Sequence, residues 1–220
     1  MRIEQIGLAT LYLGDCREVL PLVKPAVILT DPPYGISHPC NFKEVGRENL
    51  AVCNDYPDVH GDDEPFNPAP FLDLKVPTLF WGGNYFADKL PATSGWVVWD
   101  KVRPDDLDQA TCELGWTNFV KGVRRYKYLW HGMMRAGEKG ENYHPTQKPV
   151  ALMKWVIGLR WTPKEGVIFD PYLGAGATGV AAVTMKREFI GCEIEPRYFD
   201  IACRRIEDAQ RQVQMFDYAP

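Results

Sequence analysis

The sequence predicts one α/β domain, residues 1–220, built on a parallel sheet with helices on its faces. Short runs of β-branched and aromatic residues recur along the chain with turn residues between them, as expected of strands. Segments with apolar residues at one-turn spacing separate some of these runs and indicate helices. The composition, 45% hydrophobic and 25% charged over 220 residues, is ordinary for a globular protein with a full core. Strand, glycine-rich turn, helix and strand follow one another, and such βαβ units build parallel sheets.

The expected strands are residues 10–14, 26–30, 78–81, 96–99, 167–170 and 188–192. The expected helices are residues 149–159, 178–186 and 196–212. In the first of these helices, Leu152, Met153, Val156 and Ile157 recur at one-turn spacing, and Pro149 suits the first turn. Ligands of parallel sheets bind at the carboxyl ends of the strands. We therefore look for the site among the residues that follow these strands.

Two stretches do not fit the sheet pattern. Residues 38–70 are rich in Asn, Asp, Gly and Pro and are long for a plain connection. They are either a mobile functional loop or partly disordered. Residues 103–143 mix basic and aromatic side chains, and we expect them to form an insertion with a role of its own.

Charge and cysteine content exclude some classes of protein. The net charge of -4 argues against nonselective coating of nucleic acid but leaves room for a local basic face. No apolar run approaches the roughly 20 residues of a membrane span, and residues 1–13 lack a signal-peptide layout, so we expect a cytoplasmic protein without membrane contact. The six cysteines include no CxxC pair and the histidines show no ligand spacing, so no metal and no disulfide framework is expected.

A glycine-rich turn follows the fifth expected strand. Gly174, Gly176 and Gly179 spell GxGxxG between a strand and a helix, where glycines permit a tight turn and close approach of a ligand. Glu193 follows the next strand at a spacing that suits a carboxylate accepting ribose hydroxyls. The pattern fits a dinucleotide or any adenosine-containing cofactor, and a purely structural turn is the alternative. Asp170 would repel a pyrophosphate and attract the sulfonium and ammonium groups of S-adenosylmethionine, which favours that cofactor.

The second expected strand ends in Asp31-Pro32-Pro33-Tyr34. The prolines lack backbone donors, so the Asp31 carboxylate and the Pro32 carbonyl offer acceptors beside the aromatic face of Tyr34. These groups suit the exocyclic amino group of a flat base: hydrogen bonds from both N–H groups would localise the nitrogen lone pair, and methyl transfer then needs positioning more than a strong base. The base must leave the duplex and would stack on Tyr34. The alternative is an ordinary strand-to-loop turn with a hydrogen-bonded aspartate.

With these motifs the chain resembles the β group of the amino-methylating DNA methyltransferases over about residues 8–206. The resemblance is carried by Asp31-Pro32-Pro33-Tyr34, by Asp-Pro-Tyr-Leu-Gly-Ala-Gly at 170–176 and by His-Pro-Thr-Gln-Lys-Pro at 144–149. The catalytic motif precedes the cofactor motif, as in the permuted order of that group. The resemblance implies a Rossmann-like, seven-stranded, circularly permuted methyltransferase sheet. It also implies site-specific methylation of DNA at N6 of a flipped adenine with S-adenosylmethionine as cofactor, any restriction partner being a separate chain.

The resemblance further implies roles for individual residues. The catalytic residues it implies are Asp31, Pro32, Pro33 and Tyr34, and Asp31 also faces the cofactor. The other cofactor-binding residues it implies are Asp15, Cys16, Thr146, Gln147, Lys148, Asp170, Pro171, Tyr172, Gly174, Gly176, Thr178 and Glu193. Residues 81–84 and 99–101 are similar to strand-end segments that line the base pocket. Ala175 and Ala177 stand where the family loop usually carries Ser or Thr, so a hydroxyl contact is missing there.

A basic and aromatic segment lies between the expected base pocket and His144. Basic side chains meet phosphates, and arginines can read guanine edges. Its place resembles the recognition region of the β group, so we interpret it as a DNA contact, with a solvated surface hairpin as the alternative. We therefore expect residues 103–143 to form a small DNA-recognition insertion within the domain. The candidate DNA-binding residues are Lys121, Arg124, Arg125, Lys127 and Arg135.

Residues 38–70 are a candidate lid that closes beside the flipped base. We expect their acidic residues to face away from DNA, or to keep DNA out when the cofactor is absent.

Rival functions stay open at this stage. Cytosine-N4 methylation uses the same amino chemistry, and Asp rather than Ser at position 31 favours adenine by resemblance. Ring-carbon methylation of cytosine is disfavoured because the only Pro-Cys pair, Pro39-Cys40, lies beyond Asp-Pro-Pro-Tyr. A binding module could keep the fold without catalysis, and an NAD-dependent oxidoreductase would explain the glycines but not Asp-Pro-Pro-Tyr. The recognition sequence and the oligomeric state, a homodimer included, are not determined by the sequence.

Overall fold

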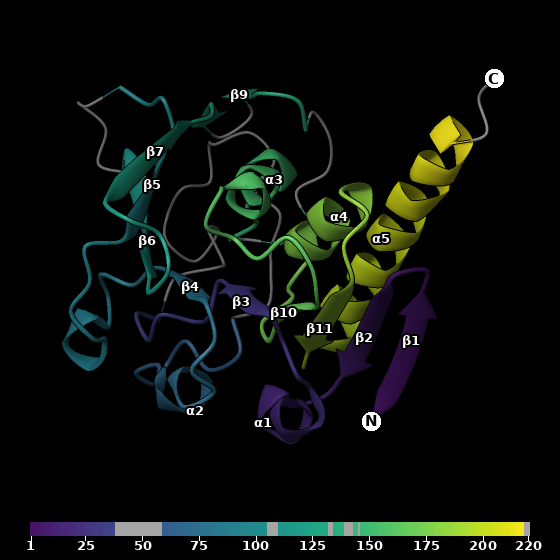
Figure 1. The fold of residues 1–220 in the computed structure, drawn as a ribbon, viewed down its shortest axis with the longest axis horizontal. Helices are drawn as coiled ribbons and strands as arrows, with labels where there is room; N and C mark the ends of the chain where they lie inside the picture. The colour runs from purple at the N-terminus through teal and green to yellow at the C-terminus, as the bar shows by residue number, and fades with distance from the viewer. Residues whose placement is uncertain (38–58, 105–109, 132–133, 139–142, 145, 218–220) are drawn as a thin grey trace, which may run out of the picture.

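The fold is known from a computed structural model, which describes residues 1–37, 59–104, 110–131, 134–138, 143–144 and 146–217. Nine strands form one sheet in the order β1-β2-β11-β10-β3-β4-β6-β5-β7 (Figure 1). These strands are β1 (Arg2–Ile6), β2 (Ala9–Leu13), β3 (Val27–Thr30), β4 (Thr78–Trp81), β5 (Trp96–Asp100), β6 (Cys112–Thr117), β7 (Val123–Lys127), β10 (Ile168–Asp170) and β11 (Phe189–Glu193). A separate hairpin pairs β8 (Trp130–His131) with β9 (Met134–Arg135).

The middle of the sheet is parallel. Strands β2, β11, β10, β3 and β4 run parallel to one another, so their carboxyl ends meet at one edge. Strand β6 is antiparallel to both β4 and β5, and β1 is antiparallel to β2. All six strands expected from the sequence are confirmed to within one residue at each end. The expected count of seven is exceeded because β1 and β7 each add a strand at an outer edge.

The stretch at residues 103–143 differs from its prediction. The expectation that it does not fit the sheet is wrong for β6 and β7, because β6 pairs between β4 and β5 and β7 pairs in parallel with β5. Strand β6 has no period-two pattern of apolar residues and contains Gly115, which weakens a strand signal. Gly115 is suited to its position nevertheless, since a Cβ there would lie 2.5 Å from Cγ2 of Val97.

The helices divide between the two faces of the sheet (Figure 1). The three expected helices are confirmed and pack on one face, with the last one five residues longer than predicted: α3 (Val150–Gly158), α4 (Ala177–Thr184) and α5 (Pro196–Asp217). The other face is covered by short elements: α1 (Cys16–Val19), η1 (Leu20–Leu22) and α2 (Ala69–Leu72), with η2 (Ala87–Lys89) following β4. In the described part of the chain, no helix has the length and apolar character needed to cross a membrane.

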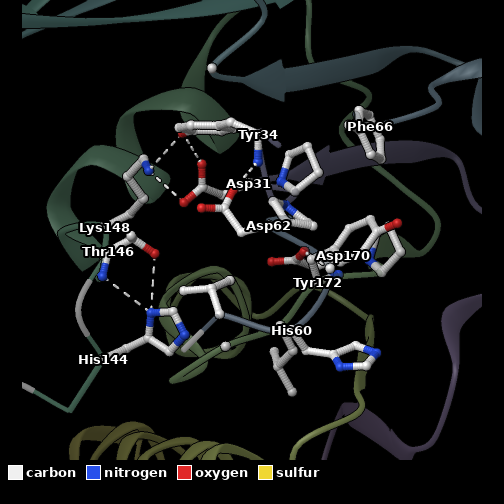
Figure 2. A pocket seen from close by; sticks show the side chains of 18 of the residues that line it. Asp31, Tyr34, His60, Asp62, Phe66, His144, Thr146, Lys148, Asp170 and Tyr172 are labelled. Atoms are coloured by element: carbon white, nitrogen blue, oxygen red, sulfur yellow. Dashed lines mark hydrogen bonds and ion pairs between the residues drawn. The ribbon is translucent and has the colours of Figure 1, made fainter. Parts of the chain in front are cut away.

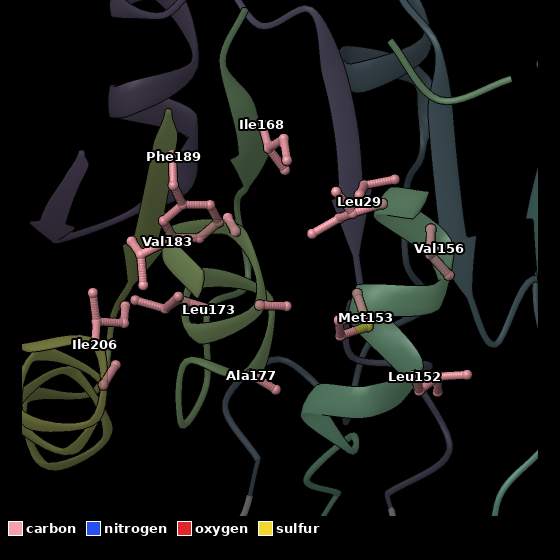
Figure 3. Close-up of a cluster of buried hydrophobic side chains, with 14 of the residues drawn as sticks. Leu29, Leu152, Met153, Val156, Ile168, Leu173, Ala177, Val183, Phe189 and Ile206 are labelled. Carbon is pink, nitrogen blue, oxygen red and sulfur yellow. The ribbon is translucent and has the colours of Figure 1, made fainter. Parts of the chain in front are cut away.

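The helix side of the sheet holds the larger core (Figure 3). The predicted apolar stripe of α3, represented by Met153 and Val156, is fully buried against Leu29 of β3 and Ile168 of β10. Burying a side chain of this kind contributes about 1.5–3 kcal/mol. Strands β3 and β10 are therefore fixed side by side at the centre of the molecule. The chain continues from β10 to β11 on one side and from β3 to β4 on the other, and ligands bind at such a switch point.

Candidate active site

A cavity of about 1320 Å³ opens at the carboxyl ends of the central strands. Its wall includes Asp31 directly after β3, Gly82 after β4, Asp170 at the end of β10 and Glu193 at the end of β11. Pockets for one small molecule usually measure about 300–1,000 Å³. The cavity therefore has room for a cofactor and a second flat molecule together.

The glycine turn forms one wall of this cavity. Gly174 and Gly176 have positive φ angles of 53° and 81°, which glycine adopts without strain. Gly174 lines the cavity, as predicted. Gly176 instead packs against α5, where a Cβ would lie 3.0 Å from Cβ of Ala202. Gly176 thus shapes the turn into α4, and it is absent from the cavity wall.

Asp170 is almost fully buried at the floor of the site. Its carboxylate accepts hydrogen bonds from the Thr30 hydroxyl at 2.7 Å and from the Tyr172 backbone N–H at 3.2 Å, and the Thr178 side chain also bonds to it. Burial raises the pKa of this carboxyl to about 7 and outweighs these hydrogen bonds, which lower it. A cation bound beside Asp170 would restore the ionised form, so the site is suited to a positively charged ligand.

Glu193 fixes the glycine turn by hydrogen bonds and can still accept further hydrogen bonds from a ligand. Its Oε2 accepts the Gly174 N–H at 2.7 Å and its Oε1 accepts the Glu195 N–H at 2.9 Å. Each carboxylate oxygen has a second lone pair, which leaves both able to accept a ligand hydroxyl. This carboxyl and the Asp170 carboxyl line the same cavity, so the groups present fit an adenosine cofactor with a cationic tail.

The residues predicted to meet the adenine end of the cofactor lie at and near α1. Asp15 caps α1 by accepting the Arg17 N–H at 2.8 Å and also pairs with the Arg17 guanidinium. That guanidinium holds the pKa of Asp15 below its usual value. The Cys16 side chain is buried beside Tyr172, and Asp15, Cys16, Pro171 and Tyr172 all line the cavity. The structure therefore brings these four predicted cofactor residues to one end of the site.

The catalytic loop places Asp31 between two donors (Figure 2). The Tyr34 hydroxyl donates to Oδ1 of Asp31 at 2.5 Å, and Lys148 Nζ donates to Oδ2 at 2.5 Å. Pro32 and Pro33 line the cavity beside them. Burial raises the pKa of Asp31, and the Lys148 ammonium opposes that rise.

Lys148 also reaches a carboxylate that the sequence did not single out. Glu113 of β6 lies 3.0 Å from Lys148 Nζ and 2.5 Å from Lys101 Nζ. Burial opposes ionisation of Glu113, but these two ammonium groups hold its pKa at about 2. No local pattern marks Glu113, because its role depends on β6 pairing between β4 and β5.

Asp62 is a second residue that sequence reasoning missed. It is buried, and its Oδ1 accepts the backbone N–H groups of Tyr34 and Gly35, both at 2.9 Å. Asp62 therefore lines the cavity and fixes the loop that carries Tyr34, a role that the prediction for the acids of residues 38–70 did not include. An acidic residue in a polar loop has no sequence signal that separates this role from a solvated one. The remainder of the lid prediction, residues 38–58, lies outside the described residues.

Tyr34 is held in place by its neighbours at the end of β4. Its ring stacks on Tyr85 with centroids 4.8 Å apart. Gly82 leaves the space that the ring occupies, since a Cβ there would lie 2.0 Å from Cε1 of Tyr34. Because Tyr85 covers one face of the Tyr34 ring, a base could stack only on the other face.

His144 and residues 146–148 form the cavity wall next to the glycine turn, where a Cβ on Gly174 would lie 3.8 Å from the His144 ring. His144 packs edge-on against Tyr198 with centroids 4.3 Å apart, and its Nδ1 accepts the Thr146 N–H at 3.3 Å. Burial lowers the pKa of His144 to about 4, so the ring is neutral at pH 7. Thr146, Gln147 and Lys148, which the sequence resemblance assigns to cofactor binding, all line the cavity. Among the described residues, no cluster of three or more His, Cys, Asp or Glu side chains could hold a metal ion.

The five candidate DNA-binding residues lie outside the cavity wall and do not form one group. Arg124 packs over the Trp161 ring at 4.8 Å, and Arg135 packs over Trp130 at 4.3 Å. Arg125 and Lys127 are exposed on β7, and Lys121 is exposed in the turn before it. Within the residues that the structure describes, Lys121, Arg125 and Lys127 make no cation–π contact.

Comparison with known proteins adds a family match. A sequence profile described as DNA methylase, for N6/N4 methyltransferases, matches residues 116–204. The chain is 38% identical to the type II methyltransferase M2.LlaDCHI of Lactococcus lactis subsp. cremoris, over 90% of this chain and 89% of that protein. It is 31% identical to the type II methyltransferase M2.MboI of Moraxella bovis over 57% of this chain, and this match spans only 45% of M2.MboI. A match to the type II methyltransferase M2.DpnII of Streptococcus pneumoniae, 40% identical, spans 31% of that protein.

Solved structures share the fold at low sequence identity. The M1.HpyAVI–SAM complex aligns with a TM-score of 0.57 over 90% of this chain and 98% of that one, at 20% identity. PvuII DNA methyltransferase, described as cytosine-N4-specific, aligns with a TM-score of 0.62 over 95% of this chain and 93% of that one, at 13% identity. These likenesses establish the Rossmann-like methyltransferase fold of the chain.

Proposed function

The chain belongs to the N6/N4 DNA methylase family, and from this premise we propose that it is a site-specific methyltransferase that methylates N6 of adenine in DNA with S-adenosylmethionine. The observation that carries the proposal is the placement of two carboxyl groups at neighbouring strand ends of one cavity. Asp31 follows β3 and Asp170 ends β10, and these strands pair directly. A cationic cofactor and an amino-bearing base can therefore meet between them.

The cofactor half of the cavity determines how the methyl donor would be held. S-adenosylmethionine supplies a methyl group on a positively charged sulfonium. We assign Asp170 to its cationic end and Glu193 to its ribose hydroxyls, and we assign Asp15 and Cys16 to its adenine end. Asp170 is the group that selects for positive charge, because its buried carboxyl gains most from a neighbouring cation.

The catalytic half would orient the target amino group. The Asp31 carboxylate accepts one N–H, the Pro32 carbonyl accepts the other, and the free face of Tyr34 stacks on the base. Two acceptors on one amino nitrogen direct its lone pair toward the cofactor, so catalysis rests mainly on positioning. Aspartate at position 31 supports adenine as the base. With DNA as the substrate, we expect the protein to act in the cytoplasm.

The test is mass spectrometry of nucleosides from unmethylated DNA after incubation with the protein and S-adenosylmethionine. Asp31→Asn is the matched variant, because the amide keeps the size of the side chain but loses the charge. We expect N6-methyladenine with the wild type and a loss of at least about 100-fold in the variant, with cofactor affinity retained.

Other products would overturn parts of the proposal. N4-methylcytosine would keep the amino chemistry and contradict the base assignment. Cofactor binding without any methylated base on diverse DNA would contradict the enzymatic function and favour a binding module. Equal activity in the wild type and Asp31→Asn would contradict the role of Asp31.

A further inference from the structure

Four buried or half-buried charges form an alternating chain across the base side of the cavity. Lys101 pairs with Glu113 at 2.5 Å, Glu113 with Lys148 at 3.0 Å, and Lys148 with Asp31 at 2.5 Å. The Lys148 side chain is only 7% exposed. Two positive and two negative groups balance one another, so the chain of charges is neutral. An isolated ammonium at this depth would cost several kcal/mol, and Lys148 is therefore stable here only beside a carboxylate.

Each oxygen of Asp31 already accepts one hydrogen bond in this arrangement. Tyr34 bonds to Oδ1 and Lys148 to Oδ2. A target amino group that donates to Asp31 either uses a second lone pair beside one of these donors or replaces that donor. Tyr34 has little freedom to leave, because its ring is stacked on Tyr85 and its backbone N–H is held by Asp62. Lys148 has a long, flexible side chain and a second carboxylate already within reach.

We propose that Glu113 is a positioning residue that keeps Lys148 paired when the target amino group replaces it on Asp31. This inference rests on the proposed amino methylation. Glu113 then faces Lys101 and Lys148 while Asp31 faces the substrate, and no buried charge is left without a partner. The net charge of the site is the same before and after the exchange. Glu113 acts through Lys148 and touches neither substrate nor cofactor in this role.

The neighbouring charges are consistent with this exchange. Arg103 also attracts Glu113, which strengthens its ionised form. Asp170 repels Asp31 and so favours a donor beside it. His144, on the other side of Lys148, is neutral at pH 7 and does not repel the ammonium group. Glu113 is thus ionised and ready to hold Lys148 throughout the physiological pH range.

The test is a double-mutant cycle on Glu113 and Lys148. In Glu113→Gln the amide keeps the shape but not the charge, so Lys148 retains Asp31 as its only anionic partner. We expect kcat to fall by at least about tenfold while the Kd values for S-adenosylmethionine and DNA change by less than about twofold. Without the lysine there is nothing for Glu113 to hold, so adding Glu113→Gln to Lys148→Met should change kcat by less than about threefold. Equal losses in both backgrounds would overturn the inference.

A matched control separates this role from general carboxylate loss. Glu207→Gln removes a carboxylate that pairs with Arg211 at 2.7 Å on the exposed face of α5. It should keep the wild-type kcat. If the wild-type protein binds the cofactor but methylates no DNA, the proposed function is contradicted. If the wild type and Glu113→Gln are both fully active, only the inference about Glu113 is contradicted.

A structural measurement keeps the inference testable even if Glu113→Gln fails to fold. In a crystal structure of wild type with DNA and sinefungin, a charged cofactor analogue without a transferable methyl group, Lys148 Nζ should contact Glu113 and should have left Asp31. Lys148 still bonded to Asp31 beside a docked amino group would overturn the inference.

Discussion

The Asp170 carboxylate accepts a hydrogen bond of 2.7 Å from the hydroxyl of Thr30, the last residue of the neighbouring strand β3. Thr30 directly precedes Asp31. The bond therefore joins the acid of the cofactor half to the strand that carries the acid of the catalytic half. It also favours the ionised form of Asp170, whose pKa burial has raised.

Replacing Thr30 by Val should destabilise the fold, and more so at high pH. A carboxyl with a raised folded pKa contributes stability that is fully present below its unfolded pKa and is lost as the pH rises through its folded pKa. For Asp170 that loss extends from the unfolded pKa up to about pH 7, where it is complete. The substitution moves the folded pKa further up by removing a donor to the ionised form, so in the variant the loss continues to higher pH. We expect the free energy of unfolding to fall by about 1–3 kcal/mol, with the larger loss at about pH 8 than at about pH 6.

Urea unfolding at the two pH values measures this effect. Thr162→Val is the matched control, because Thr162 is equally buried and its hydroxyl donates to the Val156 carbonyl at 2.7 Å instead of to a carboxylate. The free energy of unfolding that Thr162→Val loses should not depend on pH. If the cost of Thr30→Val is likewise independent of pH, Asp170 does not titrate near neutrality.

The affinity for S-adenosylmethionine should rise with pH through the titration of Asp170. Its pKa of about 7 means that the ionised fraction is small at pH 5.5 and large at pH 7.5. A cationic ligand binds the ionised form better, so the apparent Kd should fall by up to about 25-fold over that interval, the limit for a ligand that binds only the ionised form. His144, with a pKa of about 4, keeps its neutral form throughout.

Calorimetric titration with wild type and Asp170→Asn checks this prediction. The variant should bind more weakly and should lose the pH dependence, because the amide cannot ionise. The pKa values of Glu193 and Asp31 are also raised, and their effects on pH dependence would persist in Asp170→Asn. If the Kd of the variant still falls as the pH rises, the pH dependence belongs to one of these two groups and not to Asp170.

Gly82→Ala should impair catalysis while sparing the cofactor site. The added Cβ would lie 2.0 Å from Cε1 of Tyr34, so the ring must move away from Asp31 and Tyr85. We expect kcat to drop by at least about tenfold, with the Kd for S-adenosylmethionine within about twofold of wild type. The site of the cofactor lies on β10 and β11, away from this clash.

Gly122→Ala provides the control for backbone strain. Gly122 has the same φ angle of +69°, but a Cβ there would lie no closer than 3.7 Å to Arg124. Both substitutions should cost about 1–2 kcal/mol of stability because of the left-handed backbone, as measured by urea unfolding. Only Gly82→Ala should lose activity, and an equal loss in both would point to strain instead of displacement of Tyr34.

Strands and site residues could be predicted from the sequence where a local sequence signal coincides with the end of a strand. Strands β3 and β10 were predicted because their apolar runs are buried on both faces, and Asp31 and Asp170 were placed at one site because parallel strands end at one edge. The glycine turn was also identified, although Gly176 serves packing against α5.

The missed parts depend on contacts between distant segments. Glu113 meets Lys148 only because β6 crosses back between β4 and β5, and no period within residues 112–117 encodes that pairing. Asp62 bonds to a loop 28 residues earlier in the chain. A polar loop with several acidic residues offers no local pattern that distinguishes the one that turns inward.

Strand β7 separates the candidate DNA contacts by the alternation of its side chains. Arg124 and Tyr126 point to the side of α3, where Tyr126 stacks on Trp155 of that helix and Arg124 packs on Trp161 just after it. Arg125 and Lys127 point to the opposite side and are exposed. Alternate residues of a strand lie on opposite faces, so a DNA duplex on one face can meet only one of these pairs.

We therefore expect Arg125→Ala and Lys127→Ala to weaken DNA binding, and Arg124→Ala to lower stability instead. Removing the basic group from one phosphate should reduce the slope of log Kd against log salt concentration by about 0.9. Fluorescence anisotropy of labelled duplex over a salt series measures that slope, and thermal unfolding measures stability. The opposite result would be an unchanged salt slope in Arg125→Ala and Lys127→Ala with a reduced slope in Arg124→Ala. It would place the duplex on the α3 side of β7 and reverse the assignment of faces.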